Sequence, residues 1–98
     1  MKYFVVESII KNPNLMNDKI LKEHIEYTKS AMEKGLILIS GLKKDMSGSM
    51  FIIKSSDVKD IEDYLKNEPL KIEKIQDYTF KEFEPHYFNG DSKWFEKE

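Results

Sequence analysis

Three short segments of this chain are apolar at odd and even positions alike, and this pattern restricts the fold more than any other feature. They cover residues 2–10, 36–39 and 50–53. Successive side chains of a β-strand point to opposite faces of the sheet, so strands of this kind place apolar side chains on both faces. The fold must therefore cover both faces of a sheet.

The first strand and the first helix have clear local signals. Residues 2–10 are rich in β-branched and aromatic residues, and a turn-forming cluster follows at residues 12–14. Asn17 or Asp18 can cap a helix whose apolar residues recur at helical spacing until Gly35. We expect an amphipathic helix between the first strand and the second.

The rest of the chain completes a known order of elements. Segments 36–39 and 50–53 flank a loop with two glycines and predict an antiparallel hairpin. Residues 55–57 can cap a second helix that Pro69 ends, and the looser alternation of residues 72–83 predicts the last strand. The order is βαββαβ, which predicts a ferredoxin-like α+β fold with a four-stranded antiparallel sheet and two helices on one face. A second copy of the sheet is the simplest cover for the other face, so we expect a homodimer.

Residues 1–85 hold all of these elements and form the predicted domain. Residues 86–98 lie beyond them but carry four aromatic residues, namely Tyr87, Phe88, Trp94 and Phe95. Disordered acidic tails are normally poor in aromatic residues. We therefore expect this tail to dock on the domain or on the dimer mate.

Composition excludes several classes of site. The chain has no cysteine, which excludes disulfides, zinc–thiolate sites and a cysteine nucleophile. We expect a cytoplasmic protein without a membrane segment, because the apolar start of the chain is too short to span a bilayer and is interrupted by Glu7. Charged residues make up 35% of the chain, but the net charge is only −2. This balance argues against a nucleic-acid-binding sheet, which needs a basic surface around exposed aromatic residues.

His24 and Glu68 are the candidate acid–base residues. Helical spacing puts His24 at the margin of the buried face of the first helix, where an imidazole near a carboxylate would be suited to proton transfer. Glu68 precedes Pro69 at the predicted end of the second helix, which gives its carboxylate a defined position. The alternative is a half-exposed helix histidine in a surface hydrogen bond and a solvated glutamate at a helix stop.

Ser40 and Gly41 are candidates for substrate binding. They lie where the second strand ends, and a small turn there would let backbone amides approach a ligand while the hydroxyl reaches into a cleft. The alternative is an ordinary strand exit. We expect no metal site, because His24 and His86 are far apart and neither has acidic residues at ligand spacing.

Several of these features together resemble a known family. They are His24 in the first helix, the helix end at residues 33–35, the strand with its glycine at residues 36–41, and the Asn-Glu-Pro sequence at residues 67–69. In this combination the chain resembles the YCII-related proteins of the dimeric α/β barrel superfamily. The resemblance covers residues 1–85.

The resemblance implies a dimer formed sheet to sheet and an active site built around the helix histidine and an acidic residue. His24 matches that histidine. Two positions depart from the family pattern, because Glu68 stands where an aspartate is common and Leu42 where a proline commonly follows Ser-Gly. The longer glutamate side chain leaves its contact with His24 open, and the missing proline loosens the loop.

Two functions follow as hypotheses. The first is a cofactor-independent enzyme, of the isomerase, lyase or dehalogenase kind, that uses His24 and Glu68 for acid–base chemistry on a small organic substrate. Ser40 and the Gly41 amide would hold a polar group of that substrate. The second is a non-catalytic dimeric module that binds a small ligand or a partner protein through the same cleft or through the aromatic tail.

Overall fold

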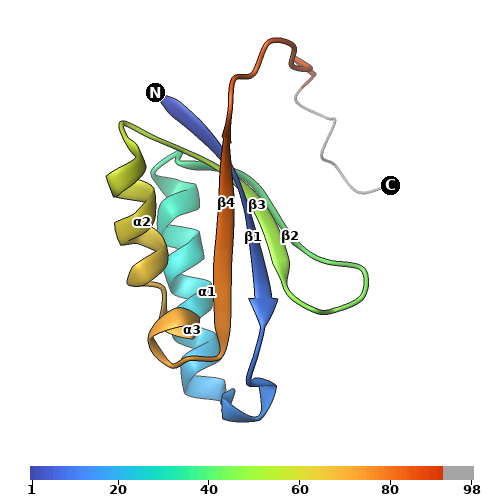
Figure 1. Cartoon of the computed structure of the whole chain (residues 1–98), viewed down its shortest axis with the longest axis vertical. Helices are drawn as coiled ribbons and strands as arrows, with labels where there is room; N and C mark the ends of the chain where they lie inside the picture. Colours follow the sequence, from blue (N-terminus) through green and yellow to red (C-terminus); the bar gives the residue numbers. More distant parts are fainter. Residues whose placement is uncertain (92–98) are drawn as a thin grey trace.

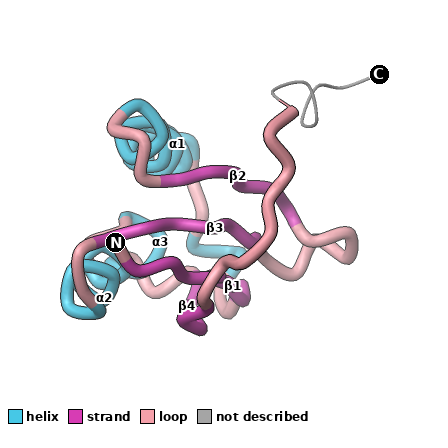
Figure 2. Tube along the Cα trace, turned by 90° about the horizontal axis from the view of Figure 1, so that it is seen from above, coloured by secondary structure: helices cyan, strands magenta, loops and turns pink. Residues whose placement is uncertain are grey.

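A computed structural model describes residues 1–91 and has the predicted α+β architecture. Its elements follow in the order β1 (Lys2–Ile10), α1 (Asp18–Glu33), β2 (Ile37–Leu42), β3 (Ser49–Ser55), α2 (Val58–Lys66), α3 (Pro69–Ile72) and β4 (Gln76–Phe83), with a 3-10 turn, η1 (Pro13–Leu15), after β1. The strands form one sheet in the order β2-β3-β1-β4, and every neighbouring pair is antiparallel. The helices lie on one side of this sheet (Figures 1 and 2).

The hydrophobic core lies between the sheet and the helices. Alternate residues of the two central strands are buried there, including Phe4 and Val6 of β1 and Ile53 of β3. Ile61 and Leu65 of α2 pack against them. Helix α1 is different, because Ala31 is its only buried residue. The sheet-facing side of α1 is thus only partly packed, and this leaves room for a cavity.

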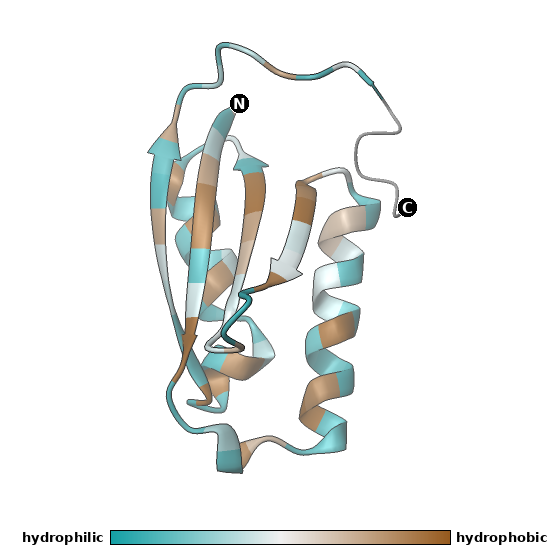
Figure 3. Cartoon of the chain, turned by 90° about the vertical axis from the view of Figure 1, so that its right-hand side faces the viewer, coloured by the Kyte–Doolittle hydropathy of each residue, from teal (hydrophilic) through white to brown (hydrophobic). Residues whose placement is uncertain are grey.

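The opposite face of the sheet has no covering layer within residues 1–91. Val5 and Ile52 are cross-strand partners at its centre and are half-buried, while Met50 and Ile39 are exposed. Figure 3 looks onto this face, where the strands carry hydrophobic stretches. The prediction of strands that are apolar on both faces is thus correct. The dimer that would cover this face stays a prediction.

Local capping signals placed both long helices correctly. The Asn17 side chain accepts a hydrogen bond from the Ile20 amide at 2.9 Å, and the Asp57 side chain accepts one from Asp60 at the same distance. Each side chain satisfies an amide that the first helical turn leaves without a partner. Gly35 ends the first helical segment in a left-handed conformation with φ of +74°.

The prediction was wrong for residues 69–75. The second helix ends before Pro69 as predicted, but this proline also begins α3, which was not predicted, and β4 starts at Gln76, four residues after the predicted Ile72. Proline fits the first position of a helix because it has no N–H that needs a partner there. The predicted exit of the second strand also lies further on, since β2 continues through Ser40 and Gly41 to Leu42.

The last described residues, 84–91, leave β4 on the side of the sheet away from the helices (Figure 1). Tyr87 and Phe88 are almost fully exposed in this single chain. The predicted docking of Trp94 and Phe95 concerns positions outside the described residues. None of the helices in residues 1–91 has both the length and the apolar character needed to cross a bilayer.

Candidate active site

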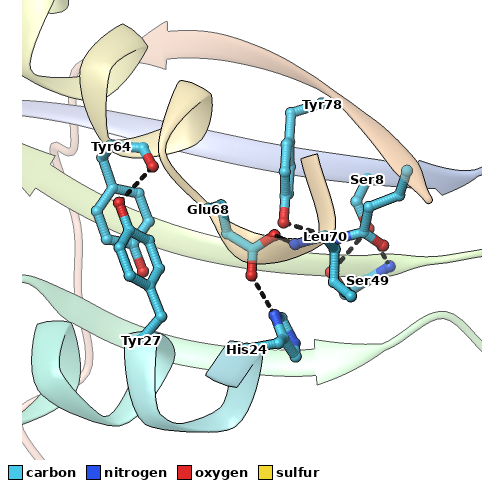
Figure 4. Close-up of polar contacts among 9 residues, drawn as sticks. Ser8, His24, Tyr27, Ser49, Tyr64, Glu68, Leu70 and Tyr78 are labelled. Atoms are coloured by element: carbon cyan, nitrogen blue, oxygen red, sulfur yellow. Dashed lines mark hydrogen bonds and ion pairs between the residues drawn. The ribbon is translucent and has the colours of Figure 1, made fainter. Parts of the chain in front are cut away.

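His24 and Glu68 meet although they are 44 residues apart in the sequence. The Nδ1 atom of His24 on α1 is hydrogen-bonded to Oε1 of Glu68 (Figure 4). Glu68 is the N-cap of α3 and is only 2% exposed, so the alternative of a solvated glutamate is wrong. The His24 side chain keeps 26% of its surface exposed. Glu68 is thus inside the protein, while His24 remains partly accessible to solvent.

A second bond holds the Glu68 carboxylate in place. Its Oε2 accepts a hydrogen bond from the Leu70 amide at 2.8 Å, which is the cap of α3. Pro69 provides no amide, so Leu70 offers the first N–H of that helix. A side-chain oxygen at the start of a helix satisfies an amide that has no partner within the helix. The residue that caps α3 is therefore also the partner of His24.

A cavity of about 260 Å³ opens beside this pair, between α1 and the sheet. Both His24 and Glu68 line it, and so do Ser40 and Gly41. All four predicted site residues thus border one cavity. The remaining lining residues are Ile25, Thr28, Lys29, Ile37, Leu42, Ser49, Phe51, Tyr64 and Tyr78.

The cavity wall combines aromatic rings with a few polar groups. Phe51 lies edge to face with both Tyr64 and Tyr78, each at a centroid distance of 6.4 Å. Three hydroxyl residues and one lysine supply polar atoms around the opening, namely Thr28, Ser40, Ser49 and Lys29. A mostly apolar pocket with a few polar groups is typical of sites for small organic molecules. Tyr3 does not line this cavity; it lies on the same side of β1 as Val5 and lines other hollows.

Three tyrosines close to the Glu68 carboxylate have a raised pKa. Burial and the charge of Glu68 raise the pKa of Tyr27 to about 12. Burial raises the pKa of Tyr64, as do the neighbouring Tyr27 and the Glu68 charge, and the pKa of Tyr78 is raised by burial and then by that same charge. All three phenols are therefore neutral hydrogen-bond donors near pH 7.

Sequence reasoning missed Tyr27 and Tyr64 as site residues. Tyr27 follows His24 by three residues on α1, and Tyr64 precedes Glu68 by four, so helical spacing was the signal that pointed to them. Their rings stack at a centroid distance of 4.7 Å, and the Tyr27 hydroxyl donates to the Tyr64 carbonyl at 2.6 Å (Figure 4). This pair joins α1 to α2 next to the cavity.

Within the described part of the chain, the His24–Glu68 pair has no third side chain of His, Cys, Asp or Glu grouped with it. Across residues 1–91, no three side chains of His, Cys, Asp or Glu gather in one place. A stable metal site needs three or four converging ligands. The geometry of the pair favours proton transfer, while the absence of a metal or another cofactor stays a prediction.

Comparisons with known proteins identify the fold. No protein-family model matches the chain, and no curated protein matches its sequence. The structure is similar to 5-chloro-2-hydroxyhydroquinone dehydrochlorinase from Burkholderia phenoliruptrix AC1100, solved in complex with 2,5-dihydroxybenzoquinone, with a TM-score of 0.71 and 16% sequence identity. The match covers 84% of this chain and 93% of that one. The likeness shows that this chain shares the α+β fold of that protein, with a four-stranded antiparallel sheet and helices.

Proposed function

We propose that this chain is a cofactor-independent enzyme that uses His24 and Glu68 for acid–base chemistry on a small organic molecule. The observation that carries the proposal is the bond from His24 Nδ1 to the buried Glu68, beside a cavity of molecular size. With Nδ1 engaged, Nε2 is the ring nitrogen left to exchange a proton with a bound molecule.

The chemistry follows from this arrangement. Nε2 of His24 takes a proton from a carbon next to a carbonyl group, and the electron pair of the broken C–H bond moves into an enolate. The imidazolium that forms is stabilised by the Glu68 carboxylate. In an isomerase the proton returns at another atom; in a lyase or dehalogenase the enolate electrons instead expel a leaving group with its bonding pair. Neither route consumes an oxidant or a reductant.

The rest of the cavity suits such a substrate. Ser40 and Ser49 carry hydroxyls that can bond a carbonyl oxygen, and Lys29 has an ammonium group that attracts a developing negative charge. At Gly41 an added Cβ would contact nothing within 4 Å, so the missing side chain leaves open space beside Ser40. The similar dehydrochlorinase, whose name and complex refer to small ring compounds, supports a small unsaturated substrate. With the sequence motifs, this fold also supports membership in the YCII-related family.

Proton exchange tests the proposal while the substrate is still unidentified. A panel of small carbon acids and lactones is incubated with the protein in D₂O, and loss of C–H signals is followed by NMR. We expect saturable exchange for at least one compound, with chemical-shift changes of amides that line the cavity. Binding without exchange would favour the non-catalytic ligand-binding module. Exchange accompanied by shift changes only elsewhere on the chain would contradict the assignment of this cavity.

A homodimer through the uncovered sheet face is part of the same proposal. Half-buried Val5 and Ile52 form its apolar centre, which a second sheet can cover. We expect sedimentation velocity to give a dimer for the unmodified chain, and monomers for Val5→Lys because a buried ammonium would lie in the interface. Ser30→Lys, on an exposed position of α1, is the control that should stay dimeric. A monomeric unmodified chain would contradict this part of the proposal.

A further inference from the structure

The Glu68 carboxylate has a third neighbour besides His24 and Leu70. The hydroxyl of Tyr78 on β4 lies next to it, as Figure 4 shows, and a hydrogen bond with Glu68 is among the causes that raise the pKa of Tyr78. His24 and Leu70 contact different oxygens of the carboxylate. Donors thus converge on this carboxylate from α1, from α3 and from the sheet.

We infer that Tyr78 is a positioning residue that fixes Glu68, and through it the tautomer and orientation of His24. A phenol is a donor of one proton, and the hydrogen of Tyr78 can serve Glu68 only if it points that way. A neighbouring residue determines this direction. Nε2 of Gln76 donates to the Tyr78 oxygen at 2.6 Å, so that oxygen acts as an acceptor toward Gln76 and as a donor toward Glu68.

Burial protects the hydrogen bonds of Gln76 and Tyr78 from competition with water. Gln76 is 4% exposed and Tyr78 is half-buried, so water does not readily replace their partners. Burial raises the pKa of Tyr78 well above its usual range, and the charge of Glu68 and their hydrogen bond raise it further. Tyr78 therefore stays protonated and remains a donor throughout the neutral range. Its ring is held edge to face against Phe51.

The consequence concerns the direction of the hydrogen bond within the pair. With Leu70 and Tyr78 as donors to the carboxylate, Glu68 offers acceptor oxygens to the ring, and Nδ1 of His24 is the donor in their bond. Nε2 is then the ring nitrogen that is left for a bound molecule. With its oxygens occupied by protein donors, Glu68 acts on a bound molecule through His24. Tyr78 contributes to the site without needing to touch the substrate.

The chain offers a matched control for Tyr78. Tyr27 is a second phenol near the cavity, but its hydroxyl donates to the Tyr64 carbonyl and its contact with Glu68 is one of charge alone. Tyr78→Phe and Tyr27→Phe each remove one hydroxyl and keep the ring. Gln76→Glu is a further variant that leaves Tyr78 in place but offers its proton a competing carboxylate.

NMR of protein labelled with ¹⁵N-histidine tests the inference. In the unmodified chain we expect the Nδ1–H tautomer of His24 and a downfield Nδ1–H proton. In Tyr78→Phe and in Gln76→Glu that proton should move further downfield, because a carboxylate with one donor fewer binds the remaining donors more strongly. In Tyr27→Phe it should stay at its original position.

Two results would overturn the inference. One is an unchanged Nδ1–H resonance in Tyr78→Phe and Gln76→Glu when both are folded; the other is an equal shift in Tyr27→Phe, which would indicate a general packing effect. The inference deepens the proposed function, but its readout needs no substrate. If the resonance does not respond while turnover still depends on His24, only the role of Tyr78 is lost. If the resonance responds and no turnover depends on His24, the proposed function is lost instead.

Discussion

Turnover of a substrate found by the exchange screen is expected to fall by about 10²- to 10⁴-fold in His24→Gln, the range that general acid–base catalysis supplies. Glutamine can keep a hydrogen bond to Glu68, but its amide neither takes nor gives a proton near neutral pH. The fall should appear mainly in kcat, because the proton moves only in the reaction step and binding uses the whole cavity. Steady-state kinetics of the variant against the unmodified chain measures it.

The second histidine is a natural control. His86 lies outside the fold's last strand, is largely exposed and pairs with the exposed Glu84. His86→Gln should therefore leave kcat and KM unchanged. Undiminished turnover in His24→Gln would remove the acid–base role and leave the cavity as a binding site.

Gly48→Ala is expected to lower the free energy of unfolding by about 3 kcal/mol, the upper part of the range for overpacking. A Cβ at this position would lie 2.0 Å from the carbonyl oxygen of Ser8 and 2.7 Å from its carbonyl carbon. Ser8 cannot move easily, because it is fully buried in β1 and its hydroxyl accepts a hydrogen bond from the Ser49 amide at 2.8 Å. The clash must push the β2–β3 loop away from the central strand.

Urea denaturation of Gly41→Ala provides the comparison. Gly41 lies in the same hairpin, yet a Cβ there would meet no atom within 4 Å. Its free energy of unfolding should change by less than about 0.5 kcal/mol, as is usual for substitutions on the surface. Equal stabilities of the two variants would mean that the loop does not approach Ser8 as described. Since Ser49 also lines the cavity, a displaced loop should weaken ligand binding as well.

Local signals explain how much of the fold the sequence could predict. The bounds of β1 were correct because β-branched residues and a turn cluster delimit it on their own, and the caps at Asn17 and Asp57 act within one helical turn. The prediction failed for residues 69–75 because a proline can follow the end of one helix and can also begin another. A helix begins at Pro69 only if the Glu68 side chain caps it, and the packing of the folded chain determines whether Glu68 can do so.

The contacts of the candidate site, unlike the helices and strands, could not be predicted from local signals. His24 and Glu68 were named from their residue types and from a family resemblance, and their contact spans 44 positions that no local pattern links. Gln76 was not predicted as a site residue, because a buried glutamine in a strand has no sequence signal of its own. The register of β1 with β4 places it, through the pairing of Ile10 with Gln76 and of Ser8 with Tyr78. Register over that distance follows from the folded sheet as a whole.

The order of strands in the sheet has a consequence for the timing of assembly. Strand β1 is synthesised before its neighbour β4, with every other described helix and strand between them, so β1 keeps one edge unpaired until residues 76–83 have left the ribosome. Tyr78 and Gln76 arrive with β4, after both members of the His24–Glu68 pair already exist. Nascent chains therefore hold the acid–base pair before the residues that orient it, and the site matures in the same step that closes the sheet.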